Sequence, residues 1–315
     1  MPVPVLPHPF DADADGDWLR CALHAHTTNP DGSMAPEMLV GHYDWAGFDV
    51  LAITDHWVRT VERSTKTLLV IRGAELNATL AGSRLDAHVV ALGLDSDPVR
   101  PDLEFDDLPE TLAWVTGHGG LPILAHTYWS GLRTSDFERC DGLALIEVYN
   151  AACELEVGRG LASLHWDEAL EAGHLLYAVA TDDSHHPGYD SAQAWVWVRS
   201  QERSQEAVLT ALRDGRFYSS AGPRIEVVEI TDEAIEVRCS PAQSVTLMSG
   251  RWKGARVNAG RLGYTGHGRI LETNDRGEIV RARLERPYRA PFERIEVEDA
   301  TGRRAWTNPL WMARE

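Results

Sequence analysis

Short apolar runs alternate with helix-like stretches along roughly the first 215 residues of the chain. Several runs are apolar without interruption, as in DVLAIT, LPILAH and LLYAVAT, which is typical of strands covered on both faces. Seven strand candidates in a strand–helix rhythm predict an α/β fold and favour a barrel over a doubly wound sheet. The predicted strands cover residues 18–24, 48–54, 68–74, 87–93, 121–125, 144–149 and 175–180, and the predicted helices cover residues 36–46, 108–118, 161–172 and 205–214.

The pattern changes after the segment Ala221-Gly222-Pro223. From there apolar and polar residues alternate with period two, as in RIEVVEI, AIEVRCS, SVTLMS, IVRARLE and RIEVEDA, which predicts half-buried antiparallel strands. We therefore expect a lead-in over residues 1–17, a barrel over residues 18–221 and a small β-sandwich over residues 222–315. Trp306 and Trp311 are expected to pack the sandwich against the barrel.

The chain is strongly acidic, because its 315 residues include 30 Lys and Arg against 48 Asp and Glu, a formal net charge of -18. Such a surface repels polyphosphate backbones, so binding of DNA or RNA polymers is not expected. The four cysteines form no CxxC pair, which argues against a zinc ribbon and a disulfide framework. The sequence has neither a long apolar run nor a secretion signal, and it predicts a soluble, cytoplasmic protein with no membrane segment.

Histidines and carboxylates collect at the ends of the predicted strands. His24 and His26 are two residues apart after the first run, and Asp183 and His185 repeat that spacing after the seventh. Side chains two apart on a strand point to the same face, so each pair can bind one metal ion. In a barrel the carboxyl ends of the strands meet on one face, and so many polar groups buried there without metal would be unsatisfied. The sequence thus predicts a site for several metal ions, and the candidate residues at the strand ends are His24, His26, Asp31, Asp55, His56, Glu75, His88, His126, Asp183 and His185.

The segments ALHAHTTNPDG, AITDHW, RGAELN, DAHVVALG, ILAHTYW and ATDDSHH resemble the PHP family, the polymerase and histidinol phosphatase domain. The resemblance covers roughly residues 18–221 and implies a metal-dependent hydrolase on a distorted, TIM-like barrel of about seven strands. It implies three metal ions that share nine ligands. The first ion would be held by His24, His26, Glu75 and Asp183, the second by Glu75 as a bridge with His88 and His126, and the third, which can bind more weakly, by Asp31, His56 and His185.

The segment ATDDSHH leaves a shift of one residue open, because both its Asp and its second His are doubled. We favour Asp183 over Asp182 as the ligand, since Asp183 and His185 point to one side if the strand geometry continues. Proximity in the sequence makes Asp55 and His186 the candidates for delivering a proton to the leaving group.

Four further residues are candidates for binding the substrate. Arg59, Arg84 and Arg133 lie in predicted loops near the strand ends, where they can hold a second phosphate. Asn150 ends the sixth predicted strand in IEVYN, and Glu147 of the same segment can add a carboxylate around the site.

Clustered divalent cations lower the pKa of a bridging water and neutralise charge on phosphate oxygens. We therefore expect a metal-dependent phosphoesterase that uses two or three Zn, Mn or Fe ions on a small phosphorylated metabolite or nucleotide. The first alternative is hydrolysis of a carboxylic or carbamate ester, because the C-terminal WTNPLW resembles PHP-like carbamate-ester hydrolases with a sandwich tail. The second is a non-catalytic, metal-binding regulatory module, against which the presence of all nine ligand positions argues.

Overall fold

The computed structural model describes residues 6, 8–11, 14–80, 85–98, 107–138, 140–261, 267–286 and 290–312, with the backbone alone at residues 311 and 312. None of the described helices is long and apolar enough to cross a lipid bilayer.

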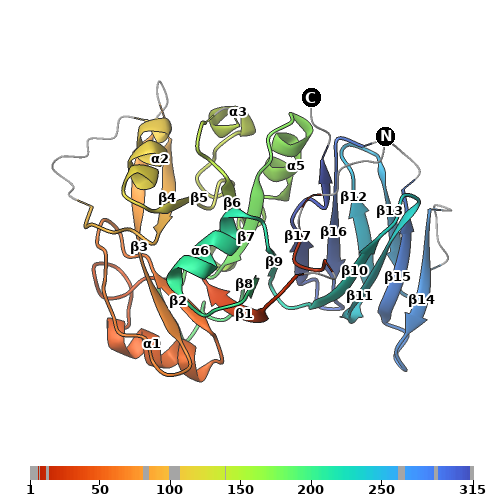
Figure 1. Ribbon diagram of the computed structural model, residues 1–315, viewed down its shortest axis with the longest axis horizontal. Helices are drawn as coiled ribbons and strands as arrows, with labels where there is room; N and C mark the ends of the chain where they lie inside the picture. The colour runs from red at the N-terminus through yellow and green to blue at the C-terminus, as the bar shows by residue number, and fades with distance from the viewer. Residues whose placement is uncertain are drawn as a thin grey trace.

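Strands and helices alternate in the first part of the chain, and each predicted strand and helix overlaps one of them (Figure 1). The sequence analysis missed β8 and β9 and the short helices α3 and α4. The strands are β1 (Asp17–Ala22), β2 (Val50–Ile53), β3 (Leu69–Thr79), β4 (Asp86–Leu92), β5 (Leu121–Leu124), β6 (Leu145–Asn150), β7 (Tyr177–Thr181), β8 (Trp195–Ser200) and β9 (Phe217–Ser220). The helices are α1 (Pro36–Trp45), α2 (Leu108–Gly117), α3 (Thr134–Phe137), α4 (Ala151–Val157), α5 (Ser163–Glu171) and α6 (Gln205–Arg213).

Burial explains why the short strands read as apolar without interruption. Every residue of β2, β5 and β7 is buried, so these strands are covered on both faces. The helix α6 has one apolar face, because Val208, Leu209, Ala211 and Leu212 are buried while its other residues face outward or lie at the edge. The side chain of Ser204 caps this helix by accepting the N–H of Ala207.

One sheet of 14 strands runs through the molecule, and along its main path the order is β13-β12-β16-β17-β9-β8-β1-β2-β3-β4-β5-β6-β7. The pairs β1–β2, β2–β3, β5–β6 and β6–β7 are parallel, whereas β3–β4, β4–β5 and β1–β8 are antiparallel. The strand β4 follows β3 after residues 80–85 only, which suffices for an antiparallel pair but not for the longer crossover of a parallel one.

The α/β class is therefore confirmed, but the closed (β/α)7 barrel is not shown. β7 lies at one end of the sheet, and among the described strands it forms a hydrogen-bonded ladder only with β6.

Side chains bridge β7 and β9 where the main-chain ladder stops. Asn308 accepts the N–H of Ala178 on β7 at 2.9 Å, and its amide donates to the carbonyls of Gly215 and Phe217 at 3.3 and 3.1 Å. Ser219 on β9 donates to the carbonyl of Ala178 at 2.8 Å. Backbone groups buried away from water must be paired, and a neighbouring strand usually supplies the partners. At this place the buried side chain of Asn308 supplies them.

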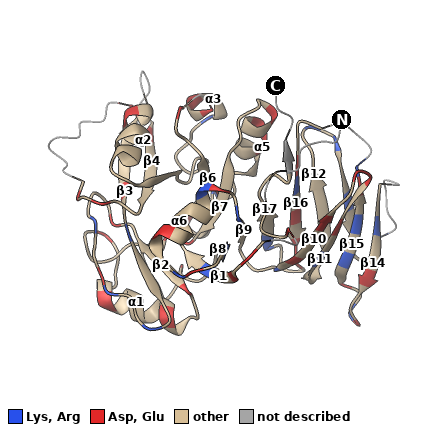
Figure 2. Cartoon of the chain, viewed as in Figure 1, with Lys and Arg blue, Asp and Glu red and all other residues tan. Residues whose placement is uncertain are grey.

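The C-terminal part forms two antiparallel layers around a common apolar core that includes Ile235, Val245 and Ile295. One layer has the order β10-β11-β15-β14, and the other is the β13-β12-β16-β17 end of the long sheet. Figure 2 shows the basic residues on β15, of which Arg281 and Arg283 pair with Glu236 at 2.7 and 3.1 Å. The strands are β10 (Ile225–Ile230), β11 (Ala234–Ala242), β12 (Ser244–Met248), β13 (Gly254–Asn258), β14 (Gly268–Thr273), β15 (Ile279–Glu285), β16 (Phe292–Glu298), β17 (Arg304–Thr307) and β18 (Trp311–Met312).

This part is attached firmly to the α/β part. The buried Arg294 of β16 pairs with Asp167 of α5 at 2.7 Å, and its guanidinium carbon lies 4.4 Å from the centre of the Trp166 ring. The expected packing of Trp306 against the α/β part is confirmed. Trp306 belongs to the apolar core of the α/β part, and its ring stacks on that of Tyr149. The Trp311 side chain lies outside the described residues. The sheet passes from β9 to β17 without a break, so the boundary at residue 222 stays a prediction.

Candidate metal centre

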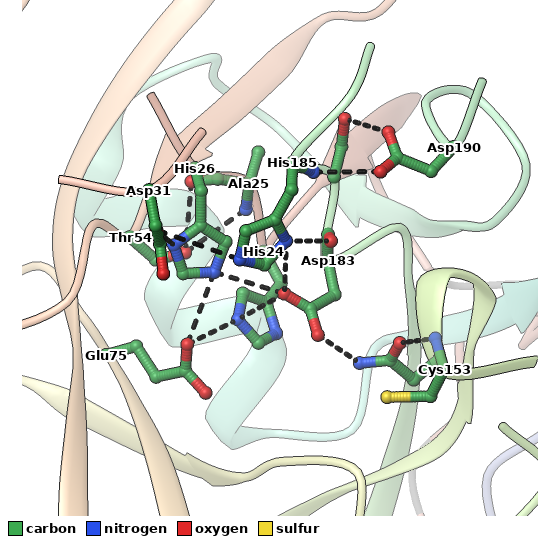
Figure 3. Close-up of polar contacts among 12 residues, drawn as sticks. His24, Ala25, His26, Asp31, Thr54, Glu75, Cys153, Asp183, His185 and Asp190 are labelled. Carbon is green, nitrogen blue, oxygen red and sulfur yellow. Dashed lines mark hydrogen bonds and ion pairs between the residues drawn. The ribbon is translucent and has the colours of Figure 1, made fainter. Parts of the chain in front are cut away.

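His24 and His26 follow β1 and are fully buried. The Nε2 atoms of both imidazoles lie 3.2 Å from Oε2 of Glu75, and they lie 3.2 and 3.1 Å from Oδ1 of Asp183 (Figure 3). These four side chains offer ligand atoms close enough together to hold one metal ion. They are the four that the resemblance to the PHP family implies for the first ion.

Glu75, on β3, lies at the centre of the cluster with both of its oxygens engaged. Its Oε1 is 2.8 Å from Nδ1 of His88 and 3.1 Å from Nε2 of His126. Its Oε2 faces His24 and His26 and also lies 3.4 Å from Nε2 of His56. One oxygen of Glu75 thus faces one set of histidines, and the other oxygen faces a second set. A carboxylate in this position can bridge two metal ions.

The third predicted group lies nearer the surface. Asp31 is 46% exposed, and its Oδ2 lies 3.4 Å from Nε2 of His56 while its Oδ1 lies 3.7 Å from Nε2 of His185. His26 Nδ1 also lies 3.7 Å from this carboxylate. The structure thus brings all nine predicted ligands together, with the third group the most open to solvent.

The backbone turns Asp183 into the cluster and Asp182 away from it. Asp182 accepts the hydroxyl of Tyr43 and the N–H groups of residues 192–194, so its oxygens are occupied outside the site. Asp183 has a φ of 52° and His126 a φ of 27°, in the left-handed region that non-glycine residues seldom adopt. Such strain at two neighbouring ligand positions is typical of functional sites.

The buried polar atoms of the cluster suit metal ions. Both ring nitrogens of His26 and Oδ1 of Asp183 are buried and make no hydrogen bond in the described part of the chain, although groups of opposite charge lie 3.1–3.7 Å away. Imidazole and carboxylate groups are the ligands of Zn, Mn and Fe. The residues present therefore fit divalent cations.

The charges of the cluster also favour cations. Burial lowers the pKa of His24 and His26, but the nearby carboxylates, chiefly Asp183 and Glu75, outweigh it; the pKa of His24 rises well above its usual range and that of His26 to about 9. Desolvation raises the pKa of Glu75, but the surrounding histidines, first among them His24, hold it well below the usual value. Metal binding in this site therefore competes with protonation of the imidazoles.

Glu147 binds two of the histidines, His24 and His126, and orients them. This buried carboxylate of β6 accepts Nδ1–H of His24 at 2.8 Å with one oxygen and the backbone N–H of His126 at 2.8 Å with the other. It also accepts the Thr181 hydroxyl and the Asn150 amide at 2.7 and 2.9 Å. A bond to Nδ1 fixes the imidazole so that Nε2 faces the cluster.

Glu147→Gln is expected to weaken metal binding about tenfold to a hundredfold, because an amide cannot accept all of these bonds and the His24 ring loses its orientation. Titration against a chelating metal indicator measures the affinity. The matched control is Glu110→Gln, the same charge change on the exposed start of α2. Equal metal affinities of the two variants would contradict this role of Glu147.

Asp55 and Asn150 do not have the positions that their predicted roles require. Asp55 is fully buried and accepts the N–H and hydroxyl of Thr27 and the hydroxyl of Thr60, so it is not placed to deliver a proton. Asn150 is also fully buried; it caps α4 and donates to Asp183 at 3.0 Å, so it supports a ligand and does not meet the substrate.

The predicted arginines are not brought to the cluster where they are described. Arg59 pairs with Asp97 at 2.7 Å, and Arg133 lines a separate pocket beside α3. Arg84 lies outside the described residues. His186 lines the pocket above the cluster and is exposed, so it remains the candidate for proton delivery.

A pocket of about 660 Å³ opens onto the cluster. Its floor includes Glu75 and Asp183, and its walls include Trp129, Leu155 and Tyr189. This volume is in the range of pockets that bind small molecules. The position of Trp129, three residues after His126, predicts that it lies near the site, but no local sequence signal marks Leu155 or Tyr189.

No protein-family model matches the chain, and no curated protein matches it. Among solved structures, an amidohydrolase from Chromobacterium violaceum and a protein from Bifidobacterium adolescentis named as a metal-dependent phosphoesterase are each 17% identical to it. Each alignment covers 54% of this chain and 89% of the other, with a TM-score of 0.39. A two-domain protein from Bacteroides vulgatus that contains a predicted PHP-like metal-dependent phosphoesterase is 16% identical over 95% of both chains, with a TM-score of 0.53. The chain therefore has the fold of this two-domain PHP-like protein, which confirms at the level of the fold the resemblance seen in its sequence.

Proposed function

We propose that this protein is a metal-dependent phosphoesterase that hydrolyses a small phosphorylated molecule. The observation that carries the proposal is the convergence of six imidazoles and three carboxylates at the base of one pocket, with Glu75 between two imidazole groups. Titratable groups whose pKa is shifted by burial and by charged neighbours in a pocket mark a candidate functional site, and His26, Glu75 and Asp183 are such groups.

The nine ligands divide into three groups around Glu75 and Asp31. His24, His26, Glu75 and Asp183 would hold one ion, Glu75 with His88 and His126 a second, and Asp31, His56 and His185 a third. Divalent Zn, Mn or Fe ions supply there a lowered pKa of coordinated water and compensation of the negative charge on a phosphoryl group. Glu147 keeps Nε2 of His24 directed at the site, and Asn150 holds Asp183.

Two features favour a small phosphate ester over a polymer. The pocket volume suits a single small molecule, and a chain with a net charge of -18 repels the backbone of a nucleic acid. His186, on the wall of the pocket, is the group that we propose to donate a proton to the leaving oxygen.

Hydrolysis of a neutral carboxylic or carbamate ester is the second candidate function. The observation in its favour is that the described residues lining the pocket include Trp129, Leu155 and Tyr189 but no Lys or Arg. A neutral ester needs no basic side chain beyond the metal site, and the same ligand cluster suits either electrophile.

Metal removal and replacement test the function. Protein treated with a chelator is expected to lose hydrolysis of phenyl phosphate, and addition of Mn, Zn or Fe to restore it by at least about a hundredfold, because the nine ligands carry the activity only with cations bound. Diphenyl phosphate and phenyl acetate are measured in parallel. If metal addition restored the hydrolysis of phenyl acetate alone, the second candidate would replace the leading function. If it restored the hydrolysis of none of the three esters, both candidate functions would be contradicted.

A further inference from the structure

The pocket has two halves of different chemistry. The inner half consists of the metal-ligand cluster, whose carboxylates are offset by imidazoles and by any bound cations. The outer half is formed by the loop after β5, by α4 and by the loop after β7, which contribute Trp129, Leu155, Glu156 and Tyr189. Trp129, Leu155 and Tyr189 are 39%, 42% and 64% exposed, so their apolar surfaces are open to a bound molecule.

Glu156 places a carboxylate in this outer half, and the indole of Trp129 lies between it and the metal-ligand cluster. Its Oε2 accepts Nε1–H of Trp129 at 3.0 Å. The Trp129 ring lies edge-on to the ring of His126, with the ring centres 5.2 Å apart, and 6.4 Å from the centre of the His88 ring. The hydrogen bond therefore holds the charge of Glu156 at the wall that a substrate must pass or touch.

No Lys or Arg of the described pocket lining offsets the charge of Glu156. The other outer carboxylate, Asp190, already accepts the hydroxyl of Ser184 and the N–H groups of His185 and His186. Arg159, close to Glu156 along the chain, has its guanidinium over the ring of Tyr128, and neither residue lines the pocket. Among the described residues, the neutral indole N–H of Trp129 is the hydrogen-bond partner of the Glu156 carboxylate.

We propose that Glu156 is a specificity-determining residue that excludes a second negative charge from the outer half of the pocket. On this basis the substrate is an ester whose leaving group is neutral or cationic and presents apolar surface to Trp129 and Leu155. The inference rests on the proposed function for the identity of the ester, but the charge preference itself applies to either candidate reaction.

Three phosphate esters with different charges on the leaving group test the proposal, and comparison of wild type with Glu156→Gln for each ester cancels the difference in leaving-group pKa. They are the phenyl phosphates with a 4-carboxylate, a 4-carboxamide or a 4-aminomethyl group, which are anionic, neutral and cationic in the leaving group. The metal-loaded wild type is expected to show the lowest kcat/KM for the anionic ester, about fivefold to tenfold below the neutral one, as repulsion across a solvated pocket predicts. The preference is expected to shrink at high salt.

Glu156→Gln is expected to raise kcat/KM for the anionic ester roughly fivefold relative to the neutral ester, because the charge is lost while glutamine still accepts the Trp129 N–H. Glu110→Gln, on α2 and outside the pocket lining, is the charge-matched control and is expected to keep the wild-type preference. A wild-type preference for the anionic ester, or the same preference in Glu156→Gln as in wild type, would overturn the proposal.

Two further series separate this inference from the proposed function. The same three substituents on phenyl acetate report the charge preference if the protein hydrolyses carboxylic esters. The matching benzylphosphonates, followed by calorimetry, report it from binding alone, with no turnover required. The order of affinities is expected to be cationic, neutral, anionic in wild type and to flatten in Glu156→Gln. If phosphate esters are not hydrolysed but this order holds, the phosphoesterase proposal fails and the role of Glu156 stands; if the order is absent, the role of Glu156 fails.

Discussion

Glu75→Gln is expected to release bound metal and to lower hydrolysis by at least about a thousandfold, which is a loss of about 4 kcal/mol of transition-state stabilisation. Five imidazoles lie within 3.4 Å of the two oxygens of Glu75. The amide keeps the shape of the side chain but removes the negative charge shared between the first and second ion groups, so both groups weaken together. Metal content by elemental analysis and kcat at limiting and saturating Mn measure the effect.

Asp31→Ala provides the comparison for Glu75→Gln. Asp31 is 46% exposed and approaches only the third group and His26, so its loss is expected to lower metal content less than the loss of Glu75 does. Glu110→Gln controls for the change in net charge, and circular dichroism checks that each variant is folded. Near-normal metal content and turnover in Glu75→Gln would show that the bridge is elsewhere, and Asp183 is the carboxylate that the geometry leaves for it.

The ligand pairs could be predicted because each follows directly on an apolar run that forms a strand. His24 and His26 come just after β1, and Asp183 and His185 come just after β7, so their position at strand ends was sufficient to bring them together. The period-two argument itself does not hold at Asp183, whose φ of 52° lies outside the strand region. The prediction for Asp55 failed because it rested on proximity in the sequence alone. Asp55 follows β2 beside His56, but its carboxylate accepts hydrogen bonds from Thr27 and Thr60.

The pocket walls and the open sheet could not be predicted because they depend on contacts between distant segments. Trp129 and Glu156 are 27 residues apart and meet only because α4 lies over the loop after β5. The antiparallel place of β4 and the late strands β8 and β9 depend on pairing partners, which a single strand pattern does not specify. Asn308 is the extreme case. Along the chain it is 130 residues from Ala178, and 93 and 91 residues from Gly215 and Phe217, whose backbone groups it binds.

Asn308→Ala is expected to lower the free energy of unfolding by about 2–4 kcal/mol, the cost of leaving buried groups of the backbone without partners. The substitution removes the acceptor for the N–H of Ala178 and the donor for the carbonyls of Gly215 and Phe217 at once. β7 has no main-chain ladder with β9. Among the described residues, the bond from the Ser219 hydroxyl to the carbonyl of Ala178 would then remain between the two strands. Urea unfolding followed by tryptophan fluorescence and circular dichroism measures the loss.

Asn258→Ala is the matched control for Asn308→Ala, because Asn258 is a half-buried asparagine of β13 whose side-chain oxygen accepts only from Arg256. It is expected to change the unfolding free energy by less than about 0.5 kcal/mol. Asn308→Asp keeps the acceptor for Ala178 but sets a carboxylate against two carbonyl oxygens, so it is expected to be destabilised at least as much as the alanine variant. If Asn308→Ala were as stable as Asn258→Ala, the edge of β7 would be held by the apolar contacts of Trp306 and its neighbours, and the hydrogen bonds of Asn308 would not be what joins β7 to β9.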